Sequence, residues 1–192
     1  MGRRGGGAAV GVAAPVAALL GLLALTVASA ALIERGLVVR AGQRLEAGAL
    51  ATNAPGVVGV LALMFFTLLR AAALLSLART AWLAAFVATA VIGRWAAVFL
   101  QALGDPIAVS GGGRSLVATP PSAWLVAALS LGAAVVAILA LGARGVVVIA
   151  LTALAAFGLG LDAQRRDQEL SAPVVAVAAA AGELIVVAVA TI

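Results

Sequence analysis

Apolar residues in this chain form long, nearly uninterrupted runs, separated by short polar breaks. A run of about 18 or more apolar residues can cross a lipid bilayer as an α-helix. Six such runs lie at about 8–33, 56–78, 81–103, 123–142, 145–161 and 173–192. The pattern predicts an all-α, polytopic integral membrane helix bundle with about six transmembrane helices, forming a single domain over residues 1–192.

Turn and capping residues mark the ends of several runs. Arg79 and Thr80 break the apolar pattern between the second and third runs, which predicts a tight helical hairpin. Ser122 follows two prolines and is expected to cap the N-terminus of the fourth span. Pro173 suits the first turn of the last span. Polar loops are expected over 105–122 and 162–171.

Residues 34–55 have a different pattern, in which charged residues alternate with Leu and Val at loosely helical spacing. That pattern is typical of an amphipathic helix lying at a membrane interface. We expect this interfacial helix over about residues 37–50, with Leu37, Val38 and Leu45 on its buried face.

Composition supports the membrane interpretation and excludes several chemistries. The chain is 65% apolar and 10% charged, with a mean hydropathy of +1.25, whereas a soluble domain is about a quarter charged. It has no cysteine and no histidine, which argues against disulfides and against zinc, haem and iron–sulfur sites. All 12 basic residues are arginine. Because arginine-rich loops serve membrane topology, the net charge of +5 indicates no nucleic-acid partner, and lipid is the expected partner.

The distribution of arginine between the loops favours one orientation only slightly. Six spans place four arginines on the side of the N-terminus, at positions 3, 4, 79 and 144. The opposite side carries six, at positions 35, 40, 44, 114, 165 and 166. The positive-inside rule therefore favours the second side as cytoplasmic by 6 to 4.

Three ionisable residues interrupt the apolar spans: Arg70, Arg94 and Glu183. A charge at the centre of a bilayer costs at least ~2.5 kcal/mol, so each should face protein or water. At the helical rise per residue, Arg70 and Arg94 lie roughly 15 and 20 Å from the same membrane face. Two converging guanidinium groups would suit a phosphate. In the alternative interpretation, Glu183 is the charge partner of one arginine and the other bonds to backbone carbonyls.

Further candidates for binding chemistry lie in the loops. Arg114 ends a glycine run that is either a phosphate-holding nest or a flexible connector. Asp162, Asp167 and Glu169 bind a divalent ion or form a solvated loop beside Arg165 and Arg166. No two acids are spaced at i, i+3 or i+4 within a span, so the sequence indicates no metal ligands inside the spans and identifies no catalytic residue.

Several segments carry distinctive patterns. Residues 56–63 follow the pattern G-x-x-G-V-x-A-L and lead into a helix with one basic residue, Arg70, and residues 93–96 read G-R-W-A. Together with the loop over 113–121 and the ending over 182–187, these segments resemble parts of the cobalamin synthase family, the adenosylcobinamide-GDP ribazoletransferases. The similarity covers the chain from about Arg44 onward.

The resemblance implies a transferase of late cobalamin biosynthesis in the bacterial cytoplasmic membrane. Such an enzyme joins α-ribazole to adenosylcobinamide-GDP and releases GMP with the help of Mg²⁺. Arg70, Arg94 and Arg114 would then bind the phosphates of the cobamide precursor. Association with other cobalamin assembly proteins, or with a second copy of the chain, is also implied.

The chain departs from the family at its acidic elements. Residues 25–36 correspond to an aspartate-rich segment but contain one acid, Glu34, and the late T-G-D element has no match around 172–181. Because Mg²⁺ prefers carboxylate oxygens, a divergent member with slow or no turnover is expected. Two alternatives are a non-catalytic scaffold or anionic-ligand-binding subunit and an unrelated small transporter or channel component.

Overall fold

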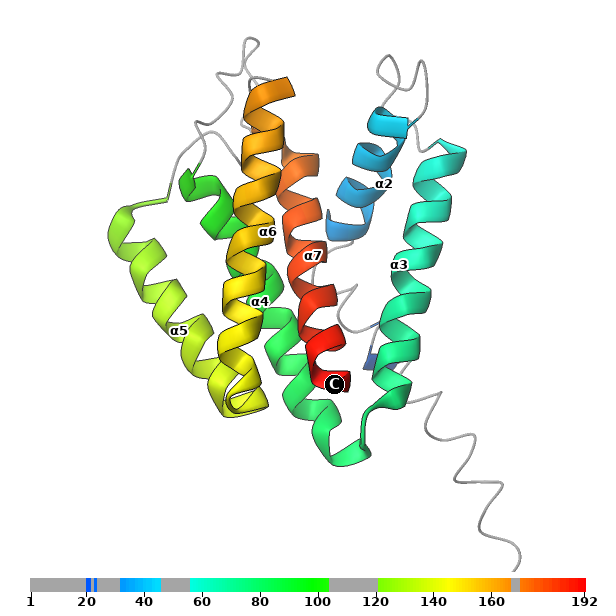
Figure 1. Cartoon of the computed structure of the whole chain (residues 1–192). Helices are drawn as coiled ribbons and strands as arrows, with labels where there is room; N and C mark the ends of the chain where they lie inside the picture. Colours follow the sequence, from blue (N-terminus) through cyan, green and yellow to red (C-terminus); the bar gives the residue numbers. More distant parts are fainter. Residues whose placement is uncertain (1–19, 22, 24–31, 46–55, 104–120, 167–169) are drawn as a thin grey trace, which may run out of the picture.

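The computed structural model is an all-α helix bundle (Figure 1), which confirms the predicted fold class. It describes residues 20, 21, 23, 32–45, 56–103, 121–166 and 170–192. Five of its helices are long and apolar enough to cross a membrane, so the protein is an integral membrane protein. They are α3 (Val57–Ser76), α4 (Trp82–Leu103), α5 (Ala123–Leu141), α6 (Arg144–Arg166) and α7 (Ala172–Thr191). Apart from residues 20, 21, 23, 32 and 33, the first predicted span lies outside the described residues.

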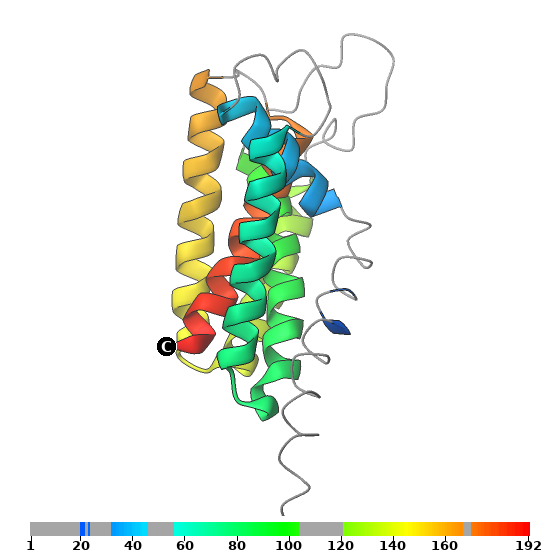
Figure 2. The same cartoon turned by 90° about the vertical axis from the view of Figure 1, so that its right-hand side faces the viewer.

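Helix α7 is the centre of the bundle, because it packs against α2 (Leu32–Leu45), α3, α4 and α6. Small residues such as Ala178 and Gly182 line its buried surface and let neighbouring helices approach closely. Helix α5 lies at the edge and buries only Ala133 and Ala137. Figure 1 shows α5 and α6 on one side of α7 and α3 on the other, and Figure 2 looks onto the side where α3 lies in front of α7.

The ends of the helices follow local sequence signals. Ser122 caps α5 by accepting a hydrogen bond from the backbone N–H of Leu125, as predicted. Gly142 ends α5 with a φ of 62°, a conformation that other residues rarely adopt. Pro173 occupies the first turn of α7, also as predicted. A 3₁₀ turn over Arg79–Ala81 joins α3 to α4.

Two elements differ from the sequence-based expectation. Helix α6 continues to Arg166, so residues 162–166, expected in a loop, are helical. The physical reason is that the positive charge of Arg165, near the C-terminal end of α6, interacts favourably with the negative end of the helix dipole.

Helix α2 begins at Leu32, five residues before the predicted interfacial helix, and its described part ends at Leu45. It lies between α3 and α7, with Val38 buried and Leu37 half-buried. Glycines explain this position. A Cβ atom at Gly36 would collide with Ala176 of α7, and one at Gly59 of α3 would collide with the Val38 carbonyl.

Candidate functional site

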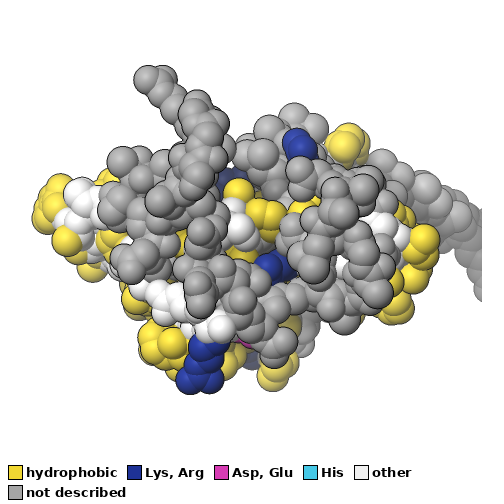
Figure 3. Space-filling model, turned by 90° about the horizontal axis from the view of Figure 1, so that it is seen from above, with side chains coloured by type: hydrophobic (Ala, Val, Ile, Leu, Met, Phe, Trp, Pro, Cys, Tyr) yellow, Lys and Arg dark blue, Asp and Glu magenta, His cyan; other side chains and the backbone are white. Residues whose placement is uncertain are grey.

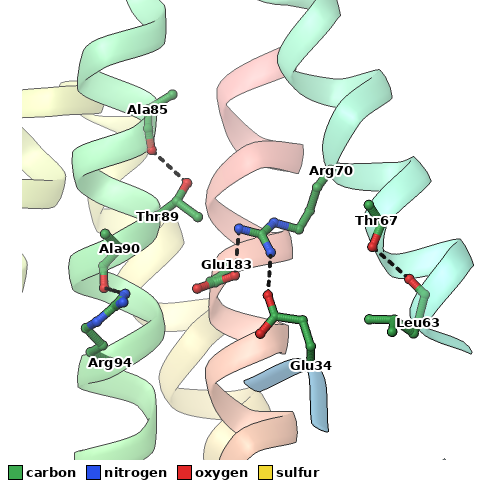
Figure 4. Close-up of polar contacts among 9 residues, drawn as sticks. All are labelled: Glu34, Leu63, Thr67, Arg70, Ala85, Thr89, Ala90, Arg94 and Glu183. Carbon is green, nitrogen blue, oxygen red and sulfur yellow. Dashed lines mark hydrogen bonds and ion pairs between the residues drawn. The ribbon is translucent and has the colours of Figure 1, made fainter. Parts of the chain in front are cut away.

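Three charged side chains from three helices meet inside the bundle, and we call them the ion cluster: Arg70 of α3, Glu183 of α7 and Glu34 of α2. Arg70 Nη2 lies 3.1 Å from Glu183 Oε2, and Arg70 Nη1 lies 3.8 Å from Glu34 Oε1 (Figure 4). The side chains of Arg70 and Glu183 are only 4% and 2% exposed. The most buried charges of the described chain are therefore paired with each other.

The helical spacing of α3 directs Arg70 into the bundle. Gly59, Phe66, Arg70 and Leu74 are the buried residues of this helix, and they recur at intervals of seven and four. Phe66 lies one turn before Arg70, and its ring centre is 5.0 Å from the guanidinium carbon. This cation–π contact gives the charge a third favourable neighbour, after the two carboxylates.

A close crossing of α4 and α7 positions Glu183. Gly93 of α4 faces Glu183 so closely that a Cβ atom there would come within 2.6 Å of the Glu183 Cγ. Gly182 makes the matching approach on α7, next to Ala96 and Thr152. The absence of side chains at these two glycines is what leaves room for a buried carboxylate between the helices.

Glu34 was not among the site residues predicted from the sequence. It lies in the first turn of α2, where a negative charge is favoured by the helix dipole. Its side chain is 13% exposed. The available signal was that Glu34 is the single acid in the segment corresponding to the acidic element of the resembled family.

Arg94 does not join Arg70, contrary to the expected convergence of the two guanidinium groups. Its Nη1 donates a hydrogen bond of 2.9 Å to the backbone carbonyl of Ala90, one turn earlier on α4, and its side chain is half-buried. Figure 4 shows it turned along its own helix, apart from Arg70. The alternative interpretation thus describes both arginines: one pairs with Glu183 and the other bonds to a backbone carbonyl. Arg114, the third candidate, lies outside the described residues.

The geometry of the ion cluster favours charge neutralisation over ligand binding. Arg70 Nη2 and Glu183 Oε2 are close but not aligned as a hydrogen bond, and the buried Arg70 Nε has no hydrogen-bond partner in the described part of the chain. Two carboxylates facing one guanidinium do not suit Mg²⁺, because the arginine already occupies the position of the cation. Among the residues that the structure describes, no three acidic, histidine or cysteine side chains converge on a possible metal position.

Trp95 contributes to packing rather than to the charged site. Its ring stacks on Phe99 at 5.2 Å between centres, and its Nε1 donates a hydrogen bond of 2.9 Å to Ser130 Oγ of α5. The contact ties the peripheral helix α5 to α4. A polar link between membrane helices stabilises the pair because neither group finds water in lipid.

Comparisons with protein-family models, with curated proteins and with solved structures gave no match. The class defined by the fold and the site is therefore an integral membrane helix bundle with a buried, internally paired ion cluster.

Proposed function

We propose that this protein is a cobalamin-synthase-like component of the bacterial cytoplasmic membrane that binds a phosphate-bearing cobamide precursor weakly and turns it over very slowly or not at all. The observation that supports this proposal is the convergence of the segments that carry the resemblance. The segment ending at Arg70, the glycine at 93 and the ending at 182–187 lie far apart in sequence, and all three contribute to the surroundings of Glu183.

The position of Glu34 also favours a relation to that family. The segment that would carry the family's acidic element contributes its one remaining acid to the same cluster. In a helix bundle unrelated to that family, there would be no reason for the segment carrying Glu34, rather than another segment, to contact Arg70. The proposal thus rests on where three matched segments and the segment carrying Glu34 meet, and not on the apolar similarity of their helices.

The charges of the cluster favour a non-catalytic role. A guanidinium that binds a substrate phosphate needs free charge, but Arg70 is compensated by Glu183 and Glu34. Phosphoryl transfer depends on positioning and on neutralising the charge of the phosphate, which Mg²⁺ supplies in the resembled family. Any Mg²⁺ would have to arrive with the substrate phosphates, since the two carboxylates already face an arginine. Arg94, which engages its own helix through one of its nitrogens, is then the described residue best suited to contact the phosphate.

The test uses the full chain in proteoliposomes with Mg²⁺, α-ribazole and adenosylcobinamide-GDP. We expect little or no GMP release and weak binding of adenosylcobinamide-GDP that is lost in Arg94→Ala. Arg165→Ala removes an exposed arginine at the end of α6 and is the matched control, which should bind as the wild type does. Robust GMP release that Arg70→Ala and Arg94→Ala both abolish would identify a working synthase instead. If the protein shows no binding of adenosylcobinamide-GDP and no GMP release, an unrelated membrane component is favoured instead.

A further inference from the structure

Helix α2 differs from the other helices of the bundle in length and in polarity. It is not among the five described helices that can cross a membrane, and four of its 14 residues are charged. Figure 1 shows it between α3 and α7, in the part of the bundle where both of these helices begin. It packs mainly against those two helices, so the packing of α7 against α4 and α6 does not depend on α2.

The first turn of α2 covers Arg70 with one charged and one apolar side chain. Glu34 faces the guanidinium, and Ile33 belongs to the apolar cluster of Phe66, whose ring lies against the same guanidinium. The contact of Arg70 with Glu34, at 3.8 Å, is longer than its contact with Glu183, at 3.1 Å. Movement of this turn would therefore uncover Arg70 and leave its pair with Glu183 in place.

The charge balance around Arg70 depends on α2. Figure 4 draws two arginines, Arg70 and Arg94, and two glutamates, Glu34 and Glu183, so these four side chains together carry no net charge. Moving Glu34 away leaves one net positive charge. Inside a bundle such a charge attracts an anion strongly, and a guanidinium suits a phosphate. Glu34 thus lies where a ligand phosphate would contact Arg70.

The end of the bundle toward which α2 leads favours the approach of anions. Figure 3 looks onto this end, and among the described side chains it shows basic groups at several places and very little acidic surface. A surface of one sign raises the local concentration of ions of the opposite sign. Withdrawal of α2 toward this end would open Arg70 to the side from which anions arrive.

The sequence of α2 also suits a location outside the bundle. Its charged residues alternate with Leu and Val, as in helices that lie at a membrane interface. Within the bundle, its buried Val38 packs closely against Gly59 of α3. A helix with two such locations is an element whose equilibrium a ligand can shift.

We propose that α2 is a plug over a concealed anion site, in which Glu34 takes the place of a ligand phosphate on Arg70 and is displaced when the ligand binds. The identity of the ligand, a phosphate-bearing molecule, rests on the proposed function, whereas the movement of α2 does not. The ligand binds only molecules whose plug has withdrawn, so the apparent affinity falls with the fraction of such molecules. The plug thus sets the weak affinity expected of the wild type.

The first test measures withdrawal of the plug without a ligand. Because the chain has no cysteine, Val38→Cys introduces a single thiol at a position that is 7% exposed. In nanodiscs, a charged thiosulfonate reagent reaches this thiol only when α2 moves. A partly exposed ion contact corresponds to a factor of about three to five in an equilibrium constant. Glu34→Gln should therefore raise the labelling rate of Val38→Cys by about that factor.

The controls separate withdrawal of the plug from general loosening. Arg35→Gln removes an exposed charge from the same turn and should leave the labelling rate unchanged. Val186→Cys places the thiol at a buried valine of α7, in the apolar cluster formed with α4, α5 and α6, and its labelling should stay slow in Glu34→Gln. If Glu34→Gln does not fold, Ile33→Val removes one methyl group from the same turn and should raise labelling of Val38→Cys about twofold or more.

The second test adds adenosylcobinamide-GDP or, separately, pyrophosphate to the chain that carries only Val38→Cys. Each should raise the labelling rate, because a ligand that binds only the withdrawn state shifts molecules toward it. Each should also bind about three to five times more tightly to Glu34→Gln. An increase with pyrophosphate alone would support the plug and refute the proposed function.

Three outcomes would overturn the proposal. The first is a labelling rate of Val38→Cys that neither Glu34→Gln nor Ile33→Val changes. The second is an equal increase at Val38→Cys and Val186→Cys, which would show that the whole bundle loosens. The third is a labelling rate that neither ligand raises, which would show that no anion displaces α2.

Discussion

Removing the negative charge of Glu183 tests whether the ion cluster stabilises the fold. Glu183→Gln keeps the shape of the side chain between α4 and α7 but leaves Arg70 buried with only Glu34, whose oxygen is 3.8 Å away. Breaking a buried ion pair by removing one partner costs about 3–5 kcal/mol. Because Glu34 remains, we expect the lower end of that range, about 3 kcal/mol of unfolding free energy.

The matched comparison is Glu34→Gln, which removes the same charge from the same guanidinium. Glu34 is more exposed than Glu183 and its oxygen lies farther from Arg70, so its removal should cost about 1 kcal/mol. Arg70→Met completes a double-mutant cycle with Glu183→Gln. The double variant removes both members of the pair, and the coupling energy should be about 2 kcal/mol.

The assay is reversible unfolding of the full chain in mixed detergent micelles, followed by tryptophan fluorescence. Trp95 is buried between helices and reports the loss of packing. A cost below ~1 kcal/mol for Glu183→Gln, which surface pairs typically show, would refute the reasoning. A Glu34→Gln variant as unstable as Glu183→Gln would contradict the assigned order of the two carboxylates.

Three further predictions concern packing and use the same unfolding assay. Gly93→Ala should lower the free energy of unfolding by about 2 kcal/mol, because its Cβ would meet Glu183 Cγ at 2.6 Å. The control Gly132→Ala, whose Cβ would point into open space, should stabilise α5 by up to about 1 kcal/mol. Equal effects of the two substitutions would argue against the close crossing of α4 and α7. Ser130→Ala should cost about 1–2 kcal/mol because the Trp95 indole N–H loses its acceptor. This cost should vanish in a Trp95→Phe background, where unfolding is followed by circular dichroism because the fluorescent reporter is absent. Gly142→Ala should cost about 1–3 kcal/mol through its φ of 62° alone, and a neutral result would show that the turn relaxes.

The transmembrane helices were predictable because their signal is local. In lipid, each helix satisfies its own backbone hydrogen bonds, so apolar length alone indicates a span. Caps and breakers such as Ser122 and Pro173 act over a few residues, and for that reason the starts of α5 and α7 were predicted to within one residue.

The position of α2 and the membership of the ion cluster were less predictable because they depend on which helices touch. The close approaches at Gly36 and Gly59 determine where α2 packs. The sequence shows that a glycine is present but not which helix will pack against it. The helical rise per residue places Arg70 and Arg94 at similar depths from one membrane face. It does not indicate how each helix is rotated about its own axis. Arg70 therefore meets Glu183, while Arg94 turns to its own backbone.

Under the proposed function, the ion cluster links stability and ligand binding with opposite signs. A guanidinium that binds a phosphate needs charge that no carboxylate already neutralises. Arg70 is paired with two carboxylates, which stabilises the fold and lowers the affinity expected of Arg70 for a phosphate. Glu183→Gln should therefore weaken the fold and, in the molecules that remain folded, tighten the binding of adenosylcobinamide-GDP several-fold by freeing charge on Arg70. Equilibrium binding in nanodiscs measures this, with Gly93→Ala as a control of similar expected instability and an intact carboxylate. Tighter binding in both variants would point to loosened packing, and weaker binding in Glu183→Gln alone would show that the carboxylate itself takes part in binding.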